Sequence, residues 1–195
     1  MMRPVHPIEA ESYRRLSAAV DLSHLPPLSR AVAERIIHAS GDTDYAGDLV
    51  LDEETLGSGW EALRADRPIV VDAEMVAAGV TGAETICRVR DKAAADLAAR
   101  RGTTRSAEGL RIAAGVAGPG AVYVIGNAPT ALEALIDLYP EPALVIGLPV
   151  GWVGAVEAKR ALRDSGLPAL SNRGRKGGSA VAAAALNALL SREVA

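Results

Sequence analysis

Three basic side chains and three glycines lie within one short segment near the end of the chain, residues 171–179. Arg173, Arg175 and Lys176 supply the charge, and an Ala-rich helix is expected to begin directly after them. Cations beside a helix N-terminus bind anions, and glycine lets the backbone approach closely. The segment lacks the GxxxxGK[ST] order of a nucleotide-binding loop, so it favours carboxylates no less than phosphates. A plain solvated basic turn remains an alternative.

His38 is a second candidate for chemistry, because it lies where a predicted helix ends. Gly41 is typical of the residue that stops a helix. His38 lies about 200° around the helix from Ile36, away from the apolar stripe, and Arg35 shares its face. An imidazole beside a guanidinium becomes a proton donor once an anionic ligand neutralises the arginine. From spacing alone, a capping or surface histidine is the simpler interpretation.

Two loops that follow predicted strands are further candidates for ligand contacts. In residues 126–130, Asn127 is expected to cap a helix that begins at Pro129, so Asn127 and Thr130 could face an anionic group. An ordinary capped turn explains this segment equally well. Residues 147–154 place three glycines around Trp152, which indicates either a wall for a flat ligand or tight packing.

Polar residues near other predicted element ends complete the candidate set. Residues 102–108 begin a helix with a Thr or Ser cap, which leaves Arg105 free for a ligand. Asp72, Glu74 and Thr81 surround the turn after the first predicted strand. Six acids with no intervening base lie between residues 42 and 54 and are expected to form a solvated loop and helix start.

Five short runs rich in Val and Ile predict the strands of a buried parallel sheet, at residues 68–72, 85–89, 121–125, 143–146 and 168–171. Helical patterns occur at residues 8–20, 27–40, 52–65, 93–101, 106–117, 129–138, 151–165 and 177–190. Strands that alternate with helices form right-handed βαβ units, so we predict an α/β fold. In such a sheet, ligands bind beyond the carboxyl ends of the strands, where the strand order reverses.

The composition limits the classes of function. The 195 residues predict one domain spanning 1–195, with N-terminal helices in 1–66 and an α/β core in 67–195. A single cysteine excludes an internal disulfide and a multi-cysteine metal site. A net charge of -3 and 3% aromatic residues disfavour nucleic acid as a partner. No apolar run approaches the roughly 18 residues of a membrane span and no signal peptide is readable, so we expect a cytoplasmic protein without membrane contact.

Six ordered segments together resemble the precorrin-8X methylmutase family: residues 35–39, 72–81, 104–106, 126–132, 149–159 and 174–179. The resemblance extends from about residue 9 to residue 190 and implies a flavodoxin-like three-layer sandwich with a five-stranded parallel sheet and an N-terminal helical extension. It implies an isomerase of cobalamin biosynthesis that moves a methyl group from ring carbon 11 to ring carbon 12 of precorrin-8X, or of cobalt-precorrin-8, to give a hydrogenobyrinate-type product. It also implies a homodimer and no separate cofactor.

The resemblance also implies roles for single residues. His38 corresponds to the catalytic histidine, which protonates the macrocycle, and the matched substrate contacts are Ser12, Arg35, Thr81 and Arg105. A substrate that carries many carboxylates needs cations, which adds Arg173, Arg175 and Lys176. An intramolecular rearrangement needs no metal site, and we expect none.

The chain departs from the family pattern in places. The connection after Thr81 is shorter and less basic than is common in the family, which could remove a substrate contact or a dimer arm, and Trp152 and Ala158 replace the usual Phe and Ser. Two other classes of function stay open. One is a non-catalytic tetrapyrrole-binding or carrier protein of the same fold. The other is a phosphate- or nucleotide-binding module, which the missing nucleotide fingerprints disfavour.

Overall fold

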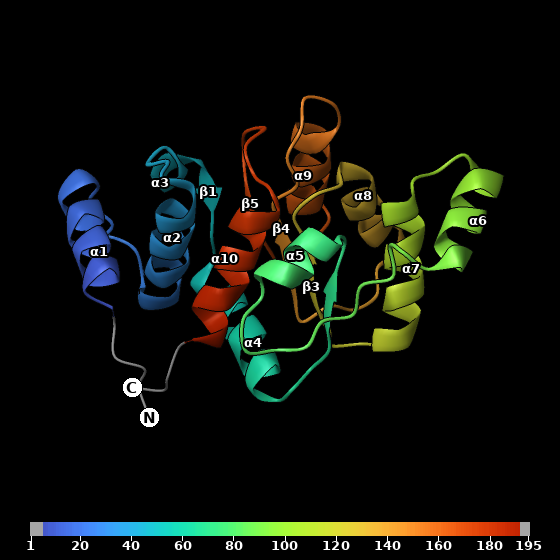
Figure 1. Cartoon of the computed structure of the whole chain (residues 1–195), viewed down its shortest axis with the longest axis horizontal. Coiled ribbons are helices and arrows are strands. Elements are labelled where there is room, and N and C mark those ends of the chain that lie inside the picture. Colours follow the sequence, from blue (N-terminus) through green and yellow to red (C-terminus); the bar gives the residue numbers. More distant parts are fainter. Residues whose placement is uncertain (1–5, 192–195) are drawn as a thin grey trace.

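A computed structural model describes residues 6–191 and shows a central sheet covered by helices on both faces (Figure 1). The helices are α1 (Pro7–Ala19), α2 (Pro27–Ser40), α3 (Tyr45–Asp48), α4 (Glu53–Arg64), α5 (Glu74–Gly79), α6 (Lys92–Arg101), α7 (Arg105–Ala117), α8 (Pro129–Leu138), α9 (Ala155–Asp164) and α10 (Ser179–Leu190). The strands are β1 (Leu49–Val50), β2 (Ile69–Val71), β3 (Val122–Ile125), β4 (Leu144–Gly147) and β5 (Ala169–Asn172). The α/β class is confirmed.

The sheet has the strand order β1-β5-β4-β3-β2. Strands β2 to β5 run parallel, with Val70 beside Tyr123 and Tyr123 beside Val145 in register. Nearly every residue of these strands is buried, because helices cover both faces, and this burial explains why the strands are continuous apolar runs.

The strand predicted at residues 85–89 does not form. Only Ile86 pairs with the sheet, through a single parallel bridge to Val70, and its backbone bonds to Ile69 and Val71. The chain then turns at residues 88–91 and enters α6, so no second pairing follows. Because Ile86 lies on the outer side of β2 and β3 on the inner side, the strand order still reverses at β2.

The fifth strand is β1, which lies in the segment expected to contain only helices. Leu49 pairs with Asn172 and Val50 with Ser171, both antiparallel. The prediction of an all-parallel flavodoxin-like sheet is therefore wrong at this edge, and the sheet is mixed. The strand β1 has only two residues, which are too few to show the alternation of apolar and polar residues that predicts a strand.

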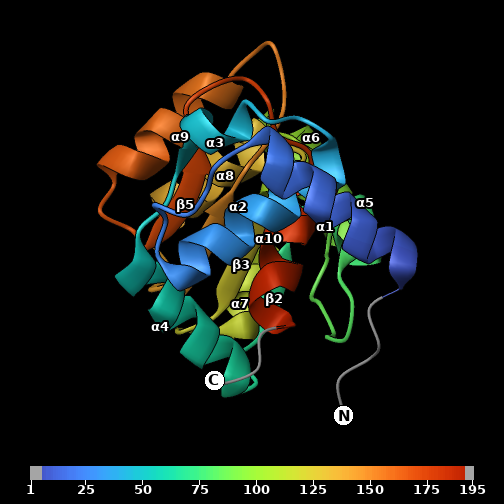
Figure 2. The same cartoon turned by 90° about the vertical axis from the view of Figure 1, so that its left-hand side faces the viewer.

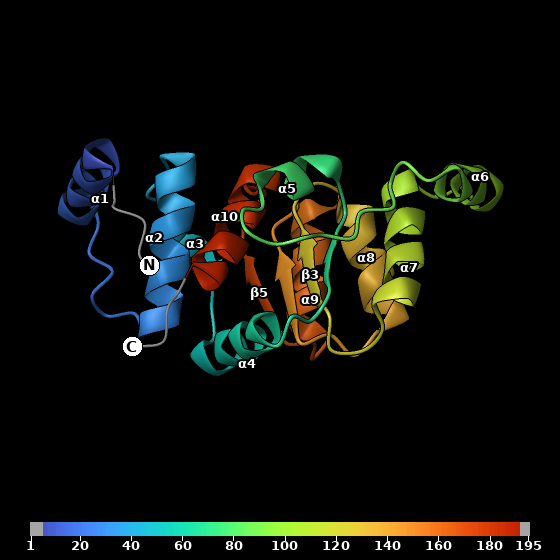
Figure 3. The ribbon, with the colours of Figure 1, turned by 60° about the horizontal axis from the view of Figure 1, so that its bottom comes forward.

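Two hydrophobic clusters lie on opposite faces of the sheet. One contains buried residues of α2, α4 and α10 together with Val71, Val124 and Ile146, and the other contains buried residues of α7, α8 and α9 together with Tyr123 and Ile125. Two helices lie outside these layers: α1 packs on α2, and α6 packs on α7 (Figures 2 and 3). Among residues 6–191, no helix is long and apolar enough to cross a membrane.

The acids of residues 42–54 help to fix the N-terminal layer. Asp52 caps α4 by accepting a hydrogen bond from the Thr55 backbone at 2.8 Å. Glu53 accepts hydrogen bonds from the backbone N–H groups of Leu28 and Ser29 at 2.7 and 2.8 Å. The first turn of α2 has no cap of its own, so a residue from α4 satisfies its free donors. The helices α3 and α5 were not predicted, because four and six residues are too few to show a helical period in the sequence.

Candidate active site

His38 lies in the last turn of α2, which ends at Gly41 with a left-handed φ of 66°, as predicted. The Nδ1 atom of His38 is 3.0 Å from the Oγ atom of Ser12 on α1. The ring of Tyr13 stacks on the imidazole, with the ring centroids 4.7 Å apart and the planes inclined by 6°. Two neighbouring residues of α1 therefore hold the imidazole, and His38 makes no other side-chain hydrogen bond among residues 6–191.

Arg35 lies one turn before His38 and contacts the same helix. Its Nη1 atom donates to the Tyr13 hydroxyl at 3.1 Å and to the Glu9 carboxylate at 3.3 Å. The hydrogen bond with Tyr13 is the main cause that raises the pKa of Arg35, so the guanidinium stays charged. The structure thus brings Ser12, Arg35 and His38 together. Glu9 already offsets part of the Arg35 charge, so a bound ligand is not the only anion that can do so.

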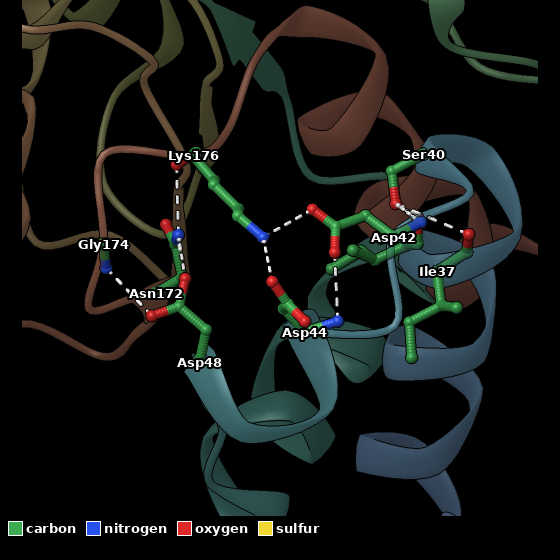
Figure 4. A network of polar contacts seen from close by, with 9 residues as sticks. Ile37, Ser40, Asp42, Asp44, Asp48, Asn172, Gly174 and Lys176 are labelled. Carbon is green, nitrogen blue, oxygen red and sulfur yellow. Dashed lines mark hydrogen bonds and ion pairs between the residues drawn. The ribbon is translucent and has the colours of Figure 1, made fainter. Parts of the chain in front are cut away.

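Lys176 lies between two acids of the segment after α2. Its Nζ atom donates to Asp42 at 2.6 Å and to Asp44 at 2.7 Å (Figure 4). These hydrogen bonds raise the pKa of Lys176 and lower the pKa of Asp42. The acidic segment was expected to be a solvated loop; Asp44 is exposed, but a lysine from a distant turn pairs with it. Because two carboxylates already neutralise the ammonium group, Lys176 should attract an anionic ligand less strongly than an unpaired lysine would.

A second polar cluster fixes the backbone of the same turn. The Asp48 carboxylate accepts hydrogen bonds from the Gly174 backbone at 2.9 Å and from Asn172 Nδ2 at 2.6 Å (Figure 4). Lys159, which is fully buried, donates to Asn172 Oδ1 and to the Lys176 carbonyl, each at 2.7 Å. Burial lowers the pKa of Lys159 to about 8. Asp48 is one of the six acids expected to be solvated, and Lys159 was not expected at the site. The spacing of Lys159 from Ala155 and Leu162, which places the three on one buried helix face, is the signal that could have found it.

The two arginines of the turn face outward instead. Arg173 and Arg175 are both exposed, and the Arg175 guanidinium lies over the Trp152 ring, 4.1 Å from its centroid. Trp152 itself is 86% exposed, so one face of the indole remains open. The turn thus carries one lysine that is already paired with two acids and two exposed arginines that are available to carboxylates.

An internal carboxylate joins the carboxyl ends of β2 and β3, where the strand order reverses. Asp72, buried at the end of β2, accepts hydrogen bonds from the backbone N–H groups of Gly126, Asn127 and Ala128 at 2.7 to 3.0 Å. Burial is the largest effect on Asp72 and raises its pKa, while the three N–H groups act in the opposite direction. The predicted cap by Asn127 is wrong, because Ala128 occupies the cap position without a side-chain bond. These N–H groups were expected to face a ligand, but they donate to the Asp72 carboxylate instead.

The starts of α7 and α8 meet close to the loop after β3. Thr104 caps α7, as predicted, and its Oγ1 atom lies 2.7 Å from that of Thr130 on α8. Arg105 follows the cap and is exposed. The buried Glu108 bonds Thr103 at 2.8 Å and Arg101 at 2.9 Å, which fixes the turn before Arg105.

Thr81 lies apart from the other candidates. Its backbone N–H donates to Asn187 Oδ1 at 3.0 Å, about two turns along α10 from the basic turn. A cavity of about 670 Å³ lies near it, at the amino end of β2, and is lined by residues that include Trp60, Arg67 and Glu84. This cavity is at the opposite edge of the sheet from the basic turn. Among residues 6–191, no group of three His, Cys, Asp or Glu side chains is arranged to hold a metal ion.

The chain is similar in sequence and structure to proteins of one family. A family model described as precorrin-8X methylmutase matches residues 7–192. A precorrin-8X methylmutase of Sinorhizobium sp is 42% identical over 200 residues, which cover 96% of this chain and 95% of the relative. A cobalt-precorrin-8 methylmutase of Methanothermobacter thermautotrophicus is 42% identical over 87% of this chain and 84% of the relative. The solved structure of a precorrin-8X methyl mutase from Thermus thermophilus has a TM-score of 0.84 at 35% identity, covering 94% of this chain and 93% of that chain.

Proposed function

This chain belongs to the precorrin-8X methylmutase family, and on that premise we propose that it moves a methyl group from ring carbon 11 to ring carbon 12 of precorrin-8X to give hydrogenobyrinate. It is an isomerase of cobalamin biosynthesis. In the proposed reaction, formally a 1,5-sigmatropic shift, one carbon–carbon bond breaks and another forms within the substrate. The protein needs to bind the macrocycle, hold it in a reactive shape and assist with a proton.

The observation that carries the proposed mechanism is the hydrogen bond between Ser12 and His38. Because Ser12 engages Nδ1, the Nε2 atom of His38 is the ring nitrogen left to deliver a proton. Protonation makes the macrocycle electron-poor and eases migration of the methyl group, after which the proton returns to His38. General acid catalysis of this kind contributes on the order of 10² to 10⁴ in rate.

The exposed cations are the proposed partners of the substrate carboxylates. Arg105, Arg173 and Arg175 are exposed, and guanidinium groups bind carboxylates in a bidentate manner. The open face of Trp152 beside Arg175 supports contact with a flat ring. The other proposed contacts are Ser12, Arg35, Thr81, Asn127, Thr130 and Lys176.

A second copy of the chain is proposed to complete the pocket. Thr81 contacts Asn187, about two turns along α10 from the basic turn, and this separation supports a pocket to which two chains contribute. Apolar side chains remain exposed near the carboxyl ends of the strands, among them Trp152 and Val153, the latter at 88%. A homodimer that covers these side chains would enclose a large macrocycle better than one small chain does.

The proposed substrate is either metal-free precorrin-8X or cobalt-precorrin-8, since the relatives carry both names. Protein groups that bind the carboxylate periphery do not distinguish the two forms. Incubation of the protein with each compound, followed by visible spectroscopy and product analysis, identifies the substrate that is converted.

The decisive control for the acid role is His38→Ala. We expect it to retain the fold and the affinity for hydrogenobyrinate but to lose most turnover, by about 10² or more. A spectrum that changes as fast as with the unmodified protein would remove His38 from the mechanism. Binding of precorrin-8X without any conversion by the unmodified protein would instead indicate a carrier.

A further inference from the structure

Tyr13 contacts both residues of the α2 face that carries the proposed acid. Its ring lies parallel to the His38 imidazole at 4.7 Å between centroids, within the range of stacked aromatic pairs. Its hydroxyl accepts a hydrogen bond from Arg35 Nη1 at 3.1 Å. The tyrosine is thus fixed at its hydroxyl end by one residue while its face covers the other.

From this geometry we infer that Tyr13 is a positioning residue for the proposed acid: its ring fixes the plane of the His38 imidazole. Ser12 fixes which edge of the imidazole faces α1, through the 3.0 Å contact with Nδ1. An edge contact alone leaves the ring free to rotate about the hydrogen bond. A parallel face at an inclination of 6° removes that rotation. Together the two residues give the Nε2 atom one direction, away from α1.

This inference rests on the proposed role of His38. General acid catalysis needs the proton within hydrogen-bonding reach of the atom that accepts it, so a rotated imidazole is a poor donor even when the substrate is bound. The helix that carries Tyr13 does not hold the ring by extensive packing, since Leu16 is the buried residue of α1. Of the local contacts of Tyr13, the stack on the His38 imidazole is therefore the one expected to decide the position of the ring.

The stack predicts a signature that needs no variant. Protons above an aromatic face resonate upfield, so the ring protons of His38 should be shifted upfield of those of His6 and His24, the other two histidines. They should also show nuclear Overhauser effects to the Tyr13 ring. Imidazole proton spectra of the whole chain, with His38→Ala to assign the signal, test this. Random-coil positions for the His38 protons without contacts to Tyr13 would overturn the inference.

Two substitutions at Tyr13 separate stacking from the hydroxyl contact. Tyr13→Phe retains the ring and is expected to keep the upfield shift and to keep kcat within about twofold. Tyr13→Leu retains bulk but removes the stack, and we expect kcat to fall about tenfold to a hundredfold while KM and the affinity for hydrogenobyrinate stay within about twofold. Arg15→Leu, at an exposed position of the same helix, controls for a leucine added to α1 and should leave kcat unchanged.

The outcomes distinguish this inference from the function on which it rests. Full turnover by His38→Ala would overturn both. Loss of turnover in His38→Ala together with an unchanged kcat in Tyr13→Leu would overturn the positioning role alone. Equal losses in Tyr13→Leu and Tyr13→Phe, or a loss that appears only in KM, would also overturn it. If Tyr13→Leu does not fold, the spectrum of the unmodified protein and the kcat of Tyr13→Phe still decide.

Discussion

At the scale of single residues, the proposed cations differ in what already surrounds them. Arg105→Ala, Arg173→Ala and Arg175→Ala should each weaken hydrogenobyrinate binding by about 1.5 to 3 kcal/mol, because each removes a charged hydrogen bond. Lys176→Ala should weaken it less, since Asp42 and Asp44 already pair with Lys176. Titration with the product at two salt concentrations measures this, and added salt should weaken binding. Unchanged affinity in all three arginine variants would place the binding face elsewhere.

Buried Lys159 predicts a pH dependence of stability. Its pKa falls from the ordinary 10.5 to about 8, so the unfolded chain binds more protons between these values. The free energy of unfolding should therefore rise with pH from about 8 to about 10.5, by up to roughly 1.4 kcal/mol per pH unit from this group. Below about pH 8 the cost of burying the charge is constant.

Urea unfolding across this pH window, compared with Lys159→Met, isolates the lysine. The variant removes the titrating group, so its free energy of unfolding should rise less steeply. Parallel pH profiles for the two proteins would show that the buried ammonium is not the cause. Ser58→Ala, at an exposed position on α4, is the control, and its free energy of unfolding should depend on pH as that of the unmodified protein does.

Asp72 predicts a large stability effect from one short side chain. Asp72→Ala leaves three backbone N–H groups without their acceptor, one at a buried position (Gly126) and two at half-buried positions, and a buried unpaired donor costs about 1 to 3 kcal/mol. We expect a total loss of about 2 kcal/mol or more in the free energy of unfolding, measured with urea. Asp72→Asn retains an acceptor oxygen and should lose less. A loss below about 1 kcal/mol in Asp72→Ala would mean that water replaces the carboxylate.

Residue types and spacing indicated some of these roles and missed others. The position of His38 off the apolar stripe, with Arg35 on its face, follows from helix geometry alone. The pairing of Lys176 with Asp42 joins residues more than a hundred positions apart, and no local pattern carries that information. Asn127 is a typical capping type, but the Asp72 carboxylate takes the neighbouring N–H groups instead.

At the scale of elements, Gly177 joins the β5–α10 turn to the β4–α9 loop. Its φ is 151°, and a Cβ atom there would collide with the Leu148 carbonyl oxygen. Gly177→Ala should therefore lower the thermal midpoint and weaken product binding, because Arg175 and Lys176 precede it.

Gly115→Ala, in a helix with open space around the position, should raise stability by about 0.5 to 1 kcal/mol. Thermal unfolding of both variants measures this, and a similar effect at the two positions would contradict the packing argument.

Strong periodicity and clear punctuation made some elements predictable. The helices Pro27–Ser40 and Pro129–Leu138 have the predicted limits, because proline marks each start and the apolar spacing continues to the end. The apolar run at residues 85–89 has strand composition, but the turn at residues 88–91 ends its pairing after Ile86. Residue types indicate that a segment can form a strand, but they do not show where the folded chain turns away from the sheet. The two-residue strand β1 is defined by its antiparallel pairing with β5, which no local pattern predicts.

At the scale of the whole molecule, we predict a homodimer with a shared site. Light scattering at micromolar concentration should give twice the 20.1 kDa chain mass. If His38 and Arg105 serve one pocket from opposite chains, a mixture of His38→Ala and Arg105→Ala subunits should recover activity in the mixed dimers. No recovery would place both residues in the same subunit, and a fully active monomer would contradict the dimer.

The short strand pairings at both edges of the sheet also affect how readily the protein aggregates. An open strand border is a template for pairing with another chain, and long flat borders promote aggregation. Here β1 covers part of the outer side of β5 with two residues, and the Ile86 bridge covers the outer side of β2. Within residues 6–191, neither border of the sheet therefore offers a long row of free backbone groups. The irregular ends of this sheet thus act as protection against fibre-like growth.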